Sequence, residues 1–126
     1  MPRILIADDD APSREAYGMS LKLAGHDLSE AKDGREAMRL LGERTFDLVV
    51  LDLAMPSPDG VSVLQAIRKN ATWRRLPVIV VTALPQGEAE RRVAGLGVVA
   101  VLIKSRFSRK DLLVHIQRAL SRPAAA

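Results

Sequence analysis

The chain has 126 residues, of which 48% are apolar, 27% are charged and only 3% are aromatic, and its formal net charge is +4. That length suits one domain with a single core, which must be built from aliphatic side chains. The sequence contains no cysteine, which excludes disulfides, thiolate metal sites and cysteine nucleophiles. It has neither a signal peptide nor a membrane-spanning run, so we expect a cytoplasmic protein.

The positive charge is concentrated in the C-terminal third. Residues 1–85 carry 11 Lys and Arg against 12 Asp and Glu, whereas residues 86–126 carry 8 against 3. A basic region of this kind can contact an acidic partner, although a solvated surface is the commoner explanation. The chain has no nucleic-acid-binding motif, and we expect no direct nucleic-acid binding.

Strand and helix patterns alternate in the first part of the chain. The apolar run 3–7 predicts a strand, and Pro12 and Ser13 mark the start of a helix that ends at Gly25-His26. Residues 27–31 predict a weaker strand, and Asp33 with Glu36 is typical of the capped start of a second helix. The apolar positions expected to face the core are Tyr17, Leu21, Ala24, Ala37, Leu40 and Leu41.

The same alternation continues to the end of the chain. Residues 46–51, 78–81 and 98–103 predict three more strands, each dominated by apolar side chains. Asp59 and Ser108 are expected to cap the third and fifth helices, and Gly95 or Gly97 to close the fourth. The apolar positions of these helices are Val63, Leu64, Ile67, Ala89, Val93, Leu96, Leu112, Leu113, Ile116 and Leu120.

Five strand–helix units in succession predict an α/β fold with a doubly wound, five-stranded parallel sheet, right-handed crossovers and five helices. We expect one domain over residues 1–121. Residues 122–126 (Arg-Pro-Ala-Ala-Ala) are expected to be a tail or the start of a linker, and the sequence leaves open whether an output domain follows.

Polar side chains stand at the ends of four of the predicted strands. Asp8 and Asp9 follow the first strand, Asp52 ends the third, Thr82 the fourth and Lys104 the fifth. Because the carboxyl ends of parallel strands lie at one edge of the sheet, these side chains are expected to converge there. Each alone has an ordinary explanation, such as a cap or a surface charge, and Asp10 is expected to be only a cap or a solvated loop acid.

The residue types at this edge indicate phosphoryl chemistry. Clustered carboxylates repel one another unless a cation compensates them. Oxygen ligands without His or Cys suit a hard ion, and Mg²⁺ favours a few carboxylates together with waters and a phosphate. The Lys104 ammonium and Thr82 hydroxyl are suitable donors to phosphate oxygens. The set is typical of phosphoryl transfer onto a carboxylate, whereas His26 and His115 lie elsewhere and are assigned no chemistry.

With these residues, and with the Met55-Pro56 and Asp59-Gly60 turns, the chain over residues 3–121 resembles the receiver domain of two-component response regulators. The resemblance implies a flavodoxin-like sheet of order 2-1-3-4-5. It also implies phosphorylation by a sensor histidine kinase or a histidine phosphotransfer protein, with self-catalysed phosphorylation and slow dephosphorylation as the only enzymatic activity. It assigns Asp52 as phospho-acceptor, and Asp8, Asp9 and Asp52 with the Ala54 carbonyl as ligands of Mg²⁺ or Mn²⁺. It also assigns Thr82 as switch hydroxyl and Lys104 as phosphate contact.

The sequence departs from the family pattern at two places near Lys104. Receivers usually have proline after this lysine, whereas here Ser105 follows and Arg106 is an additional residue before Phe107. A non-proline bond strongly prefers trans, so we expect a different loop after Lys104. Val101 stands where the family usually has Tyr or Phe, so we expect the usual threonine–aromatic switch to be missing.

Two positions near the acceptor are apolar, namely Ala54, two residues after Asp52, and Leu84, two residues after Thr82. In receivers, polar residues at these positions help to orient a water for hydrolysis. Neither side chain here can hydrogen-bond a water. We therefore expect a comparatively long-lived phospho-form.

Three alternatives remain in view. A phosphorylation-independent receiver that acts only as an interaction module is favoured by Ser105 and Val101. An aspartyl-phosphate phosphohydrolase is disfavoured because it needs an acid at Ala54, and a dinucleotide-binding domain because acids 8–10 replace a glycine-rich loop. As a receiver, the chain is expected to signal through protein–protein contacts of its basic C-terminal third with an acidic partner. Dimerisation is left open.

Overall fold

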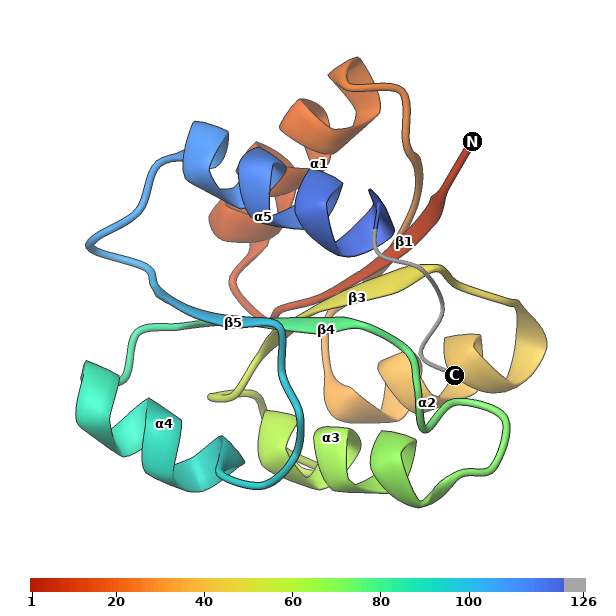
Figure 1. Cartoon of the computed structure of the whole chain (residues 1–126), viewed down its shortest axis with the longest axis vertical. Coiled ribbons are helices and arrows are strands. Elements are labelled where there is room, and N and C mark those ends of the chain that lie inside the picture. The colour runs from red at the N-terminus through yellow and green to blue at the C-terminus, as the bar shows by residue number, and fades with distance from the viewer. Residues whose placement is uncertain (122–126) are drawn as a thin grey trace.

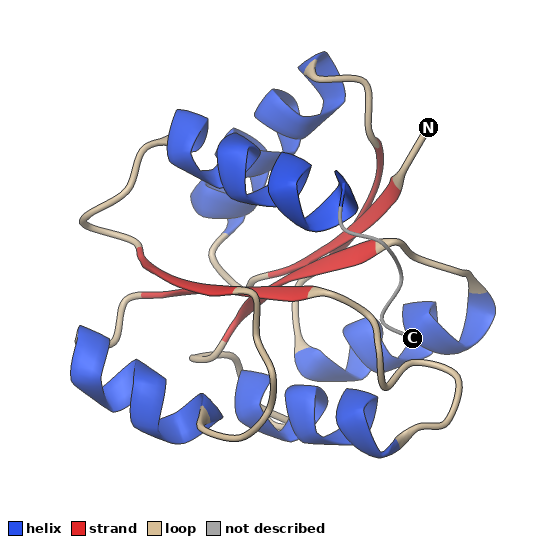
Figure 2. Ribbon diagram, viewed as in Figure 1, coloured by secondary structure: helices blue, strands red, loops and turns tan. Residues whose placement is uncertain are grey.

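The computed structural model describes residues 1–121, which form a parallel five-stranded sheet between two layers of helices (Figure 1, Figure 2). The strand order is β2-β1-β3-β4-β5, which confirms the predicted doubly wound sheet. The predicted tail, residues 122–126, lies outside the described part. The strands are β1 (Arg3–Ala7), β2 (Asp27–Ala31), β3 (Leu48–Asp52), β4 (Val78–Thr82) and β5 (Ala100–Ile103); the helices are α1 (Ala11–Leu23), α2 (Gly34–Glu43), α3 (Gly60–Lys69), α4 (Gln86–Val93) and α5 (Arg109–Ser121).

Both faces of the sheet are covered, with α1 and α5 on one side and α2, α3 and α4 on the other (Figure 1). Alternate residues of a strand enter opposite cores, so Ile4 and Ile6 pack with α1 and α5 while Leu5 and Ala7 face the other layer. Every residue of β3 and β4 is buried. This burial explains why the central strands are uninterrupted apolar runs, as parallel sheets require.

The predicted helix starts are confirmed by side-chain caps. Asp33 accepts a hydrogen bond from the Glu36 N–H at 2.8 Å, and Asp59 accepts one from the Ser62 N–H at 2.9 Å. Ser108 and Asp111 satisfy each other's backbone N–H groups at the start of α5. Asp10 caps α1 through the Ser13 N–H, so its role is structural. Each cap satisfies a backbone donor that would otherwise have no partner at a helix start.

The structure corrects several expected positions. Phe46 and Val98 lie outside the strands that were expected to begin there, because pairing starts only at Leu48 and Ala100. Ala24 is exposed rather than core-facing, since α1 ends at Leu23. Leu96 packs against the core from beyond the end of α4. Phe46 and Leu96 are thus partly buried by tertiary packing, which local periodicity does not distinguish from a strand or helix.

Arg68, at the end of α3, connects two loops at the amino-terminal edge of the sheet. Its guanidinium donates to the carbonyls of Leu96 at 2.6 Å and Gly97 at 3.2 Å in the α4–β5 connection. It also donates to Leu76 at 2.8 Å and Arg74 at 3.2 Å in the α3–β4 connection. These carbonyls belong to irregular backbone, so the side chain supplies partners that a strand or helix would otherwise provide.

No helix among residues 1–121 is long and apolar enough to cross a membrane.

We expect Arg68→Ala to lower the free energy of unfolding by about 2 to 4 kcal/mol, since carbonyls lose a charged donor in a half-buried site. Urea denaturation monitored by circular dichroism measures this change. The control is Lys69→Ala, the exposed neighbouring residue, for which a change within about 0.5 kcal/mol is expected. Equal effects of the two substitutions would contradict the structural role of Arg68.

Candidate phosphoryl-acceptor site

Three carboxylates converge at the carboxyl ends of β1 and β3. One oxygen from each of Asp8, Asp9 and Asp52 lies within 4.8 Å of the other two. Asp8 is fully buried and Asp52 is only 3% exposed, whereas Asp9 is exposed to solvent. The structure therefore brings together the three acids that strand-end position predicted, with the solvent side of the cluster open at Asp9.

Lys104, directly after β5, compensates the two buried acids. Its Nζ lies 2.9 Å from Asp8 Oδ2 and donates to Asp8 Oδ1 at 3.1 Å and to Asp52 Oδ2 at 3.2 Å. Two backbone N–H groups also donate here, that of Asp10 to Asp8 Oδ1 and that of Ala54 to Asp52 Oδ1. Buried carboxylates are tolerated when such partners offset the loss of hydration.

Asp8 Oδ2 receives no hydrogen bond, although it lies beside the Lys104 ammonium. A buried carboxylate oxygen with an unused lone pair, next to two more carboxylates, is a suitable ligand for a hard divalent cation. The donor set contains only oxygen atoms, which suits Mg²⁺ or Mn²⁺ rather than zinc or copper. The side chains present therefore fit the ion that the sequence predicted.

Burial raises the pKa of the Asp52 carboxyl above its ordinary value, and the neighbouring charge of Asp8 adds to the effect. Hydrogen bonds from Ala54 and Lys104 oppose the rise without cancelling it. For the Lys104 ammonium, burial alone would lower the pKa, but the bonds and charges of Asp8 and Asp52 outweigh burial and raise it. Lys104 is consequently a fixed cation in the site at neutral pH.

Two glycines allow the loop after Asp52 to fold closely against the site. A Cβ at Gly60 would lie 2.1 Å from the Asp52 carbonyl oxygen, and one at Gly34 would lie 1.9 Å from the Pro58 carbonyl oxygen. Both positions therefore need glycine for close backbone approach rather than for an unusual φ angle. The Gly60 N–H also donates to the Leu53 carbonyl at 3.1 Å. The Asp59-Gly60 turn thus fixes the path of the chain around Asp52.

Thr82 and Ala54 flank the acids in different ways. Thr82 is fully buried at the end of β4, and its hydroxyl accepts a hydrogen bond from the Leu84 N–H at 3.2 Å. Among residues 1–121, Thr82 makes no side-chain hydrogen bond to the acid cluster. Ala54 is exposed beside Asp52, and Leu84 is half-buried against the core. Both predicted apolar positions thus lie beside residues of the site.

Sequence reasoning missed Arg14, which supports the site from α1. Its Nη1 donates to the Asp8 carbonyl at 2.7 Å, and its Nε lies 3.6 Å from Glu30 at the end of β2. It also missed the contact between Tyr17 of α1 and Phe107 in the β5–α5 connection, whose ring centroids are 5.8 Å apart. These contacts join residues far apart in the chain, and no local pattern indicated them.

The loop after Lys104 has a trans peptide bond at Ser105, as expected for a non-proline residue; among residues 1–121 the one cis bond is Ser57–Pro58. Lys104 nevertheless reaches both acids. Val101 is partly buried and packs against the core, so the position that carries a ring in the family carries a branched aliphatic side chain here.

Comparison with known proteins agrees with this geometry. The family model of the response regulator receiver domain matches residues 4–117. The chain belongs to this family. The receiver fold is also that of a chemotaxis response regulator, CheY4 of Vibrio cholerae, with a TM-score of 0.86 at 28% identity over 94% of this chain and 98% of that one. A Francisella response regulator receiver domain gives a TM-score of 0.87 at 31% identity over 97% of this chain and 98% of that one.

Curated relatives are longer proteins that contain a receiver. The Myxococcus xanthus gliding motility regulatory protein is 34% identical over 92% of this chain and 15% of its own length. The Pseudomonas aeruginosa phosphate regulon transcriptional regulatory protein PhoB is 32% identical over 94% of this chain and 52% of its own. The Mycobacterium tuberculosis transcriptional regulatory protein PdtaR is 37% identical over 95% of this chain and 57% of its own. This receiver thus spans 15% to 57% of the length of these relatives.

We expect Asp52→Asn to raise the stability of the metal-free receiver near neutral pH. The folded state binds the Asp52 proton more tightly than the unfolded chain, in which the pKa of this carboxyl is near 3.8. Stability is therefore lost as the pH rises from that value through the raised pKa of the folded state. The amide has no charge to bury, so its advantage should be largest at neutral pH and shrink as the pH falls toward 3.8.

Thermal unfolding in the presence of a chelator, followed across this pH range, measures the difference between the two proteins. Asp111→Asn is the matched control, because hydrogen bonds from Ser108 lower the pKa of Asp111. A lowered pKa predicts the opposite sign, namely a small loss of stability at neutral pH. A pH-independent gain from Asp52→Asn would contradict the assigned cause.

Proposed function

We propose that this receiver accepts a phosphoryl group on Asp52 from a phosphohistidine donor and passes the signal on through protein–protein contacts. The observation that carries the proposal is the pairing of Lys104 with both Asp8 and Asp52, beside the cluster of three carboxylates. A buried acid, a fixed cation and an open set of oxygen ligands are the components that phosphoryl transfer onto a carboxylate requires.

In the proposed reaction, a carboxylate oxygen of Asp52 attacks the phosphorus of the phosphohistidine. A P–O bond forms as the P–N bond breaks, and the electron pair of the P–N bond returns to the imidazole nitrogen, which takes up a proton. The product is an acyl phosphate on Asp52. Phosphate oxygens then carry negative charge close to the present position of Lys104 Nζ, 3.2 Å from Asp52 Oδ2, and the ammonium stabilises it.

Asp8, Asp9 and the Ala54 carbonyl, together with Asp52, would hold Mg²⁺ or Mn²⁺ in this proposal. When bound, such an ion supplies positive charge that offsets the phosphoryl oxygens during transfer. Arg14 fixes the Asp8 carbonyl, and the Ala54 N–H orients the Asp52 carboxylate, so the chain orients its ligands through its own contacts. The Thr82 hydroxyl is the proposed switch group at the neighbouring strand end.

We place the proposed receiver domain at residues 1–121 and its work in the cytoplasm, where histidine kinases or phosphotransfer proteins present their donor histidines. The proposed output contacts involve the basic C-terminal third, residues 86–126. Within it, Lys104 is turned inward to the acids and Arg92 pairs with Glu88 at 2.7 Å. The other basic residues of this region that the structure describes are exposed, and we propose them as the contacts to an acidic partner. They are Arg91, Arg106, Arg109, Lys110 and Arg118.

Incubation with a small phosphoramidate donor and Mg²⁺ tests the proposal, with intact mass as the readout. We expect the mass of one added phosphoryl group in the parent protein, and no addition in Asp52→Asn or after chelation of the metal. Lys104→Met should reduce the extent of phosphorylation while leaving Asp52 in place. An unmodified parent protein, or the same addition in Asp52→Asn, would favour a phosphorylation-independent interaction module instead.

The phospho-form is expected to be long-lived, because Ala54 and Leu84 offer no hydrogen-bonding group to an attacking water. Ala54 is exposed, so Ala54→Asn can be accommodated without displacing the core. We expect faster phosphate release from the variant, by several-fold to about a hundredfold if one water-orienting group is restored. A time course of phosphate release after removal of the donor measures this rate. An unchanged or slower release from Ala54→Asn would contradict the role assigned to the apolar residue at this position.

A further inference from the structure

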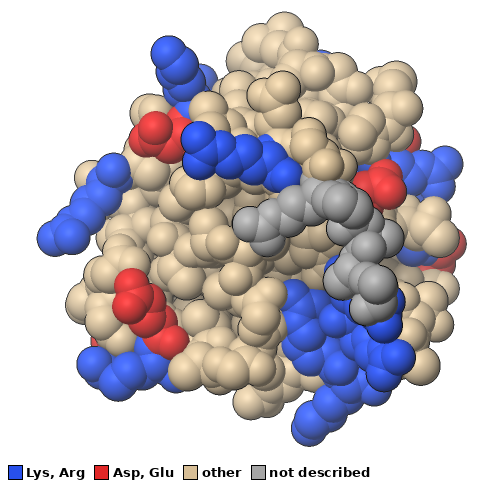
Figure 3. Space-filling model, in the orientation of Figure 1, with Lys and Arg blue, Asp and Glu red and all other residues tan. Residues whose placement is uncertain are grey.

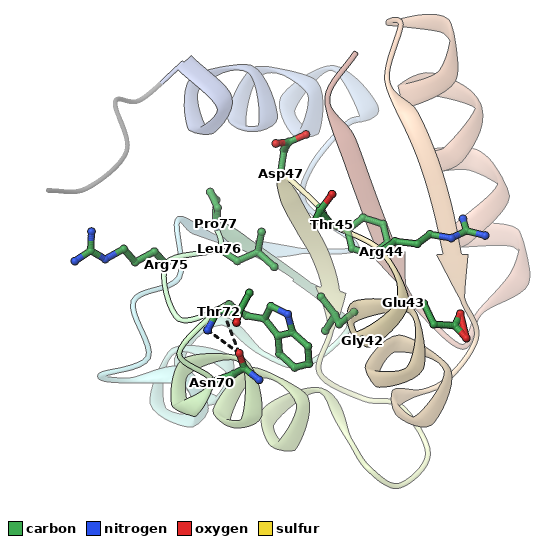
Figure 4. Close-up of a pocket in the computed structure, with 13 residues that line it drawn as sticks. Gly42, Glu43, Arg44, Thr45, Asp47, Asn70, Thr72, Arg75, Leu76 and Pro77 are labelled. Atoms are coloured by element: carbon green, nitrogen blue, oxygen red, sulfur yellow. Dashed lines mark hydrogen bonds between the residues drawn. The ribbon is translucent and has the colours of Figure 1, made fainter.

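A pocket lies at the amino-terminal edge of the sheet, opposite the acids. Its volume is about 650 Å³, and it is formed between the α2–β3 and α3–β4 connections, which face each other in Figure 4. The apolar side chains of Leu41, Phe46, Trp73 and Leu76 contribute to its lining. Pockets of this size hold small ligands or single large side chains of a partner. The proposed phosphoryl chemistry makes no use of it.

Positive charge gathers beside this pocket. Residues 60–87 contain four basic residues and no acid, and Lys and Arg side chains cluster over the α3–β4 connection (Figure 3). Arg68 is turned inward to backbone carbonyls, whereas Lys69, Arg74 and Arg75 are exposed. In the part of the chain that the structure describes, neither Lys69 nor Arg74 has a side-chain ion pair or hydrogen bond. Their charge is therefore available to a partner.

The acidic groups that line the pocket are already engaged. Glu43 pairs with Arg39 one turn earlier in α2, at 2.8 Å. Asp47 Oδ2 accepts a hydrogen bond from the Arg3 N–H at 2.7 Å. Beside its apolar floor, the pocket thus has a basic rim, defined here as Lys69 and Arg74, which adjoin the lining residues Asn70 and Trp73 in the chain. Among residues 1–121 these two cations have no side-chain partner, whereas Glu43 and Asp47 each have one. Such a rim favours an anionic occupant over a cationic or neutral one.

The α3–β4 connection is held rigidly in this position. Arg68 donates to the carbonyls of Arg74 and Leu76, and Asn70 Oδ1 accepts from the N–H groups of Thr72 and Trp73. A binding surface that is ordered before association loses less conformational entropy when a partner binds. The charged and apolar groups of this connection are therefore presented together as one preformed surface.

We propose that this pocket and its basic rim, Lys69 and Arg74, form a docking site for an acidic segment of a partner protein. One apolar side chain of that segment enters the pocket between Phe46 and Trp73, and flanking carboxylates lie against the rim. The site is on the opposite edge of the sheet from Asp52 and separate from the basic C-terminal third. It does not depend on the proposed phosphoryl transfer.

Trp73 is the chain's one tryptophan and lines the pocket, so its fluorescence reports occupancy directly. The probe is a synthetic Glu- and Asp-rich decapeptide with a central Leu, titrated into the whole protein and also followed by calorimetry. We expect saturable binding with a change in Trp73 fluorescence, and weakening as salt rises from about 50 to about 300 mM. The same peptide with Ala for Leu should bind more weakly, and a Lys-rich version should not bind.

Two matched pairs of variants test the location. Lys69→Glu with Arg74→Glu should weaken binding by roughly tenfold or more, whereas Arg109→Glu with Lys110→Glu, an equal charge change on exposed residues of α5, should weaken it by about threefold at most. A Cβ at Gly42, which lines the pocket, meets no atom within 4 Å. Gly42→Leu should therefore obstruct the pocket and weaken binding, while Gly42→Ala should not.

Several outcomes would overturn the docking site. They are the absence of saturable binding, binding without a change in Trp73 fluorescence, equal losses in the two charge-reversal pairs, and no difference between Gly42→Leu and Gly42→Ala. Asp52→Asn should bind the peptide as the parent does. Failure of phosphorylation and failure of docking are thus recorded by different measurements.

Discussion

The arrangement of this molecule depends on one ammonium group shared between two buried carboxylates. Asp8 and Asp52 lie at the ends of adjacent parallel strands, and both are buried from solvent. Two such acids would repel each other and favour protonation if no cation stood between them. Lys104, within 3.2 Å of both, is the cation that offsets this repulsion. It also ties the end of β5 to β1 and β3, although β5 pairs directly only with β4.

The same interaction bears on how the proposed phosphorylation would act on the rest of the fold. With unmodified Asp52, Lys104 is held by carboxylate oxygens, one of which is on Asp8. Additional negative charge at Asp52 changes what the ammonium faces, and Lys104 immediately precedes the β5–α5 connection. Phe107 of that connection packs against Tyr17 of α1. With Val101 in place of the family's usual ring, this aromatic contact is one physical link between the segment after Lys104 and the α1–α5 layer. The other is Arg14 of α1, which donates to the carbonyl of Asp8, the residue that Lys104 contacts.

Much of the sheet and of the acid cluster followed from local patterns. Fully buried strands such as β3 and β4 must be apolar along their whole length, which makes their carboxyl ends easy to locate. The sequence alone therefore predicts that Asp52, Thr82 and Lys104 lie at one edge of the sheet. Asp33, Asp59 and Ser108 were recognisable as caps, because their spacing to the helix N–H groups is local.

What the patterns missed is tertiary. Arg68 is an unremarkable basic residue at the end of an amphipathic helix, and only the fold reveals that carbonyls of two distant loops surround it. Arg14 likewise acquires its role from the position of Glu30 on β2. Gly34 and Gly60 are required by the close approach of backbone atoms of other segments. The Asp59-Gly60 turn was recognisable in the sequence, but a turn preference does not predict these contacts.

The distribution of charge also depends on tertiary contacts that the sequence does not reveal. It distinguishes the two edges of the sheet. Along the chain, the excess of positive charge falls on residues 86–126. Two of these cations form ion pairs within the fold, with Asp8 and Asp52 in one case and with Glu88 in the other. The shorter segment 60–87 has less total charge but no acid at all, and its exposed cations lie on or next to the residues that line the pocket. Arg68 joins that segment to the α4–β5 connection, from which β5 runs to Lys104. The strand β5 therefore separates the acid edge from the basic edge, so the two proposed sites do not overlap although they belong to one sheet.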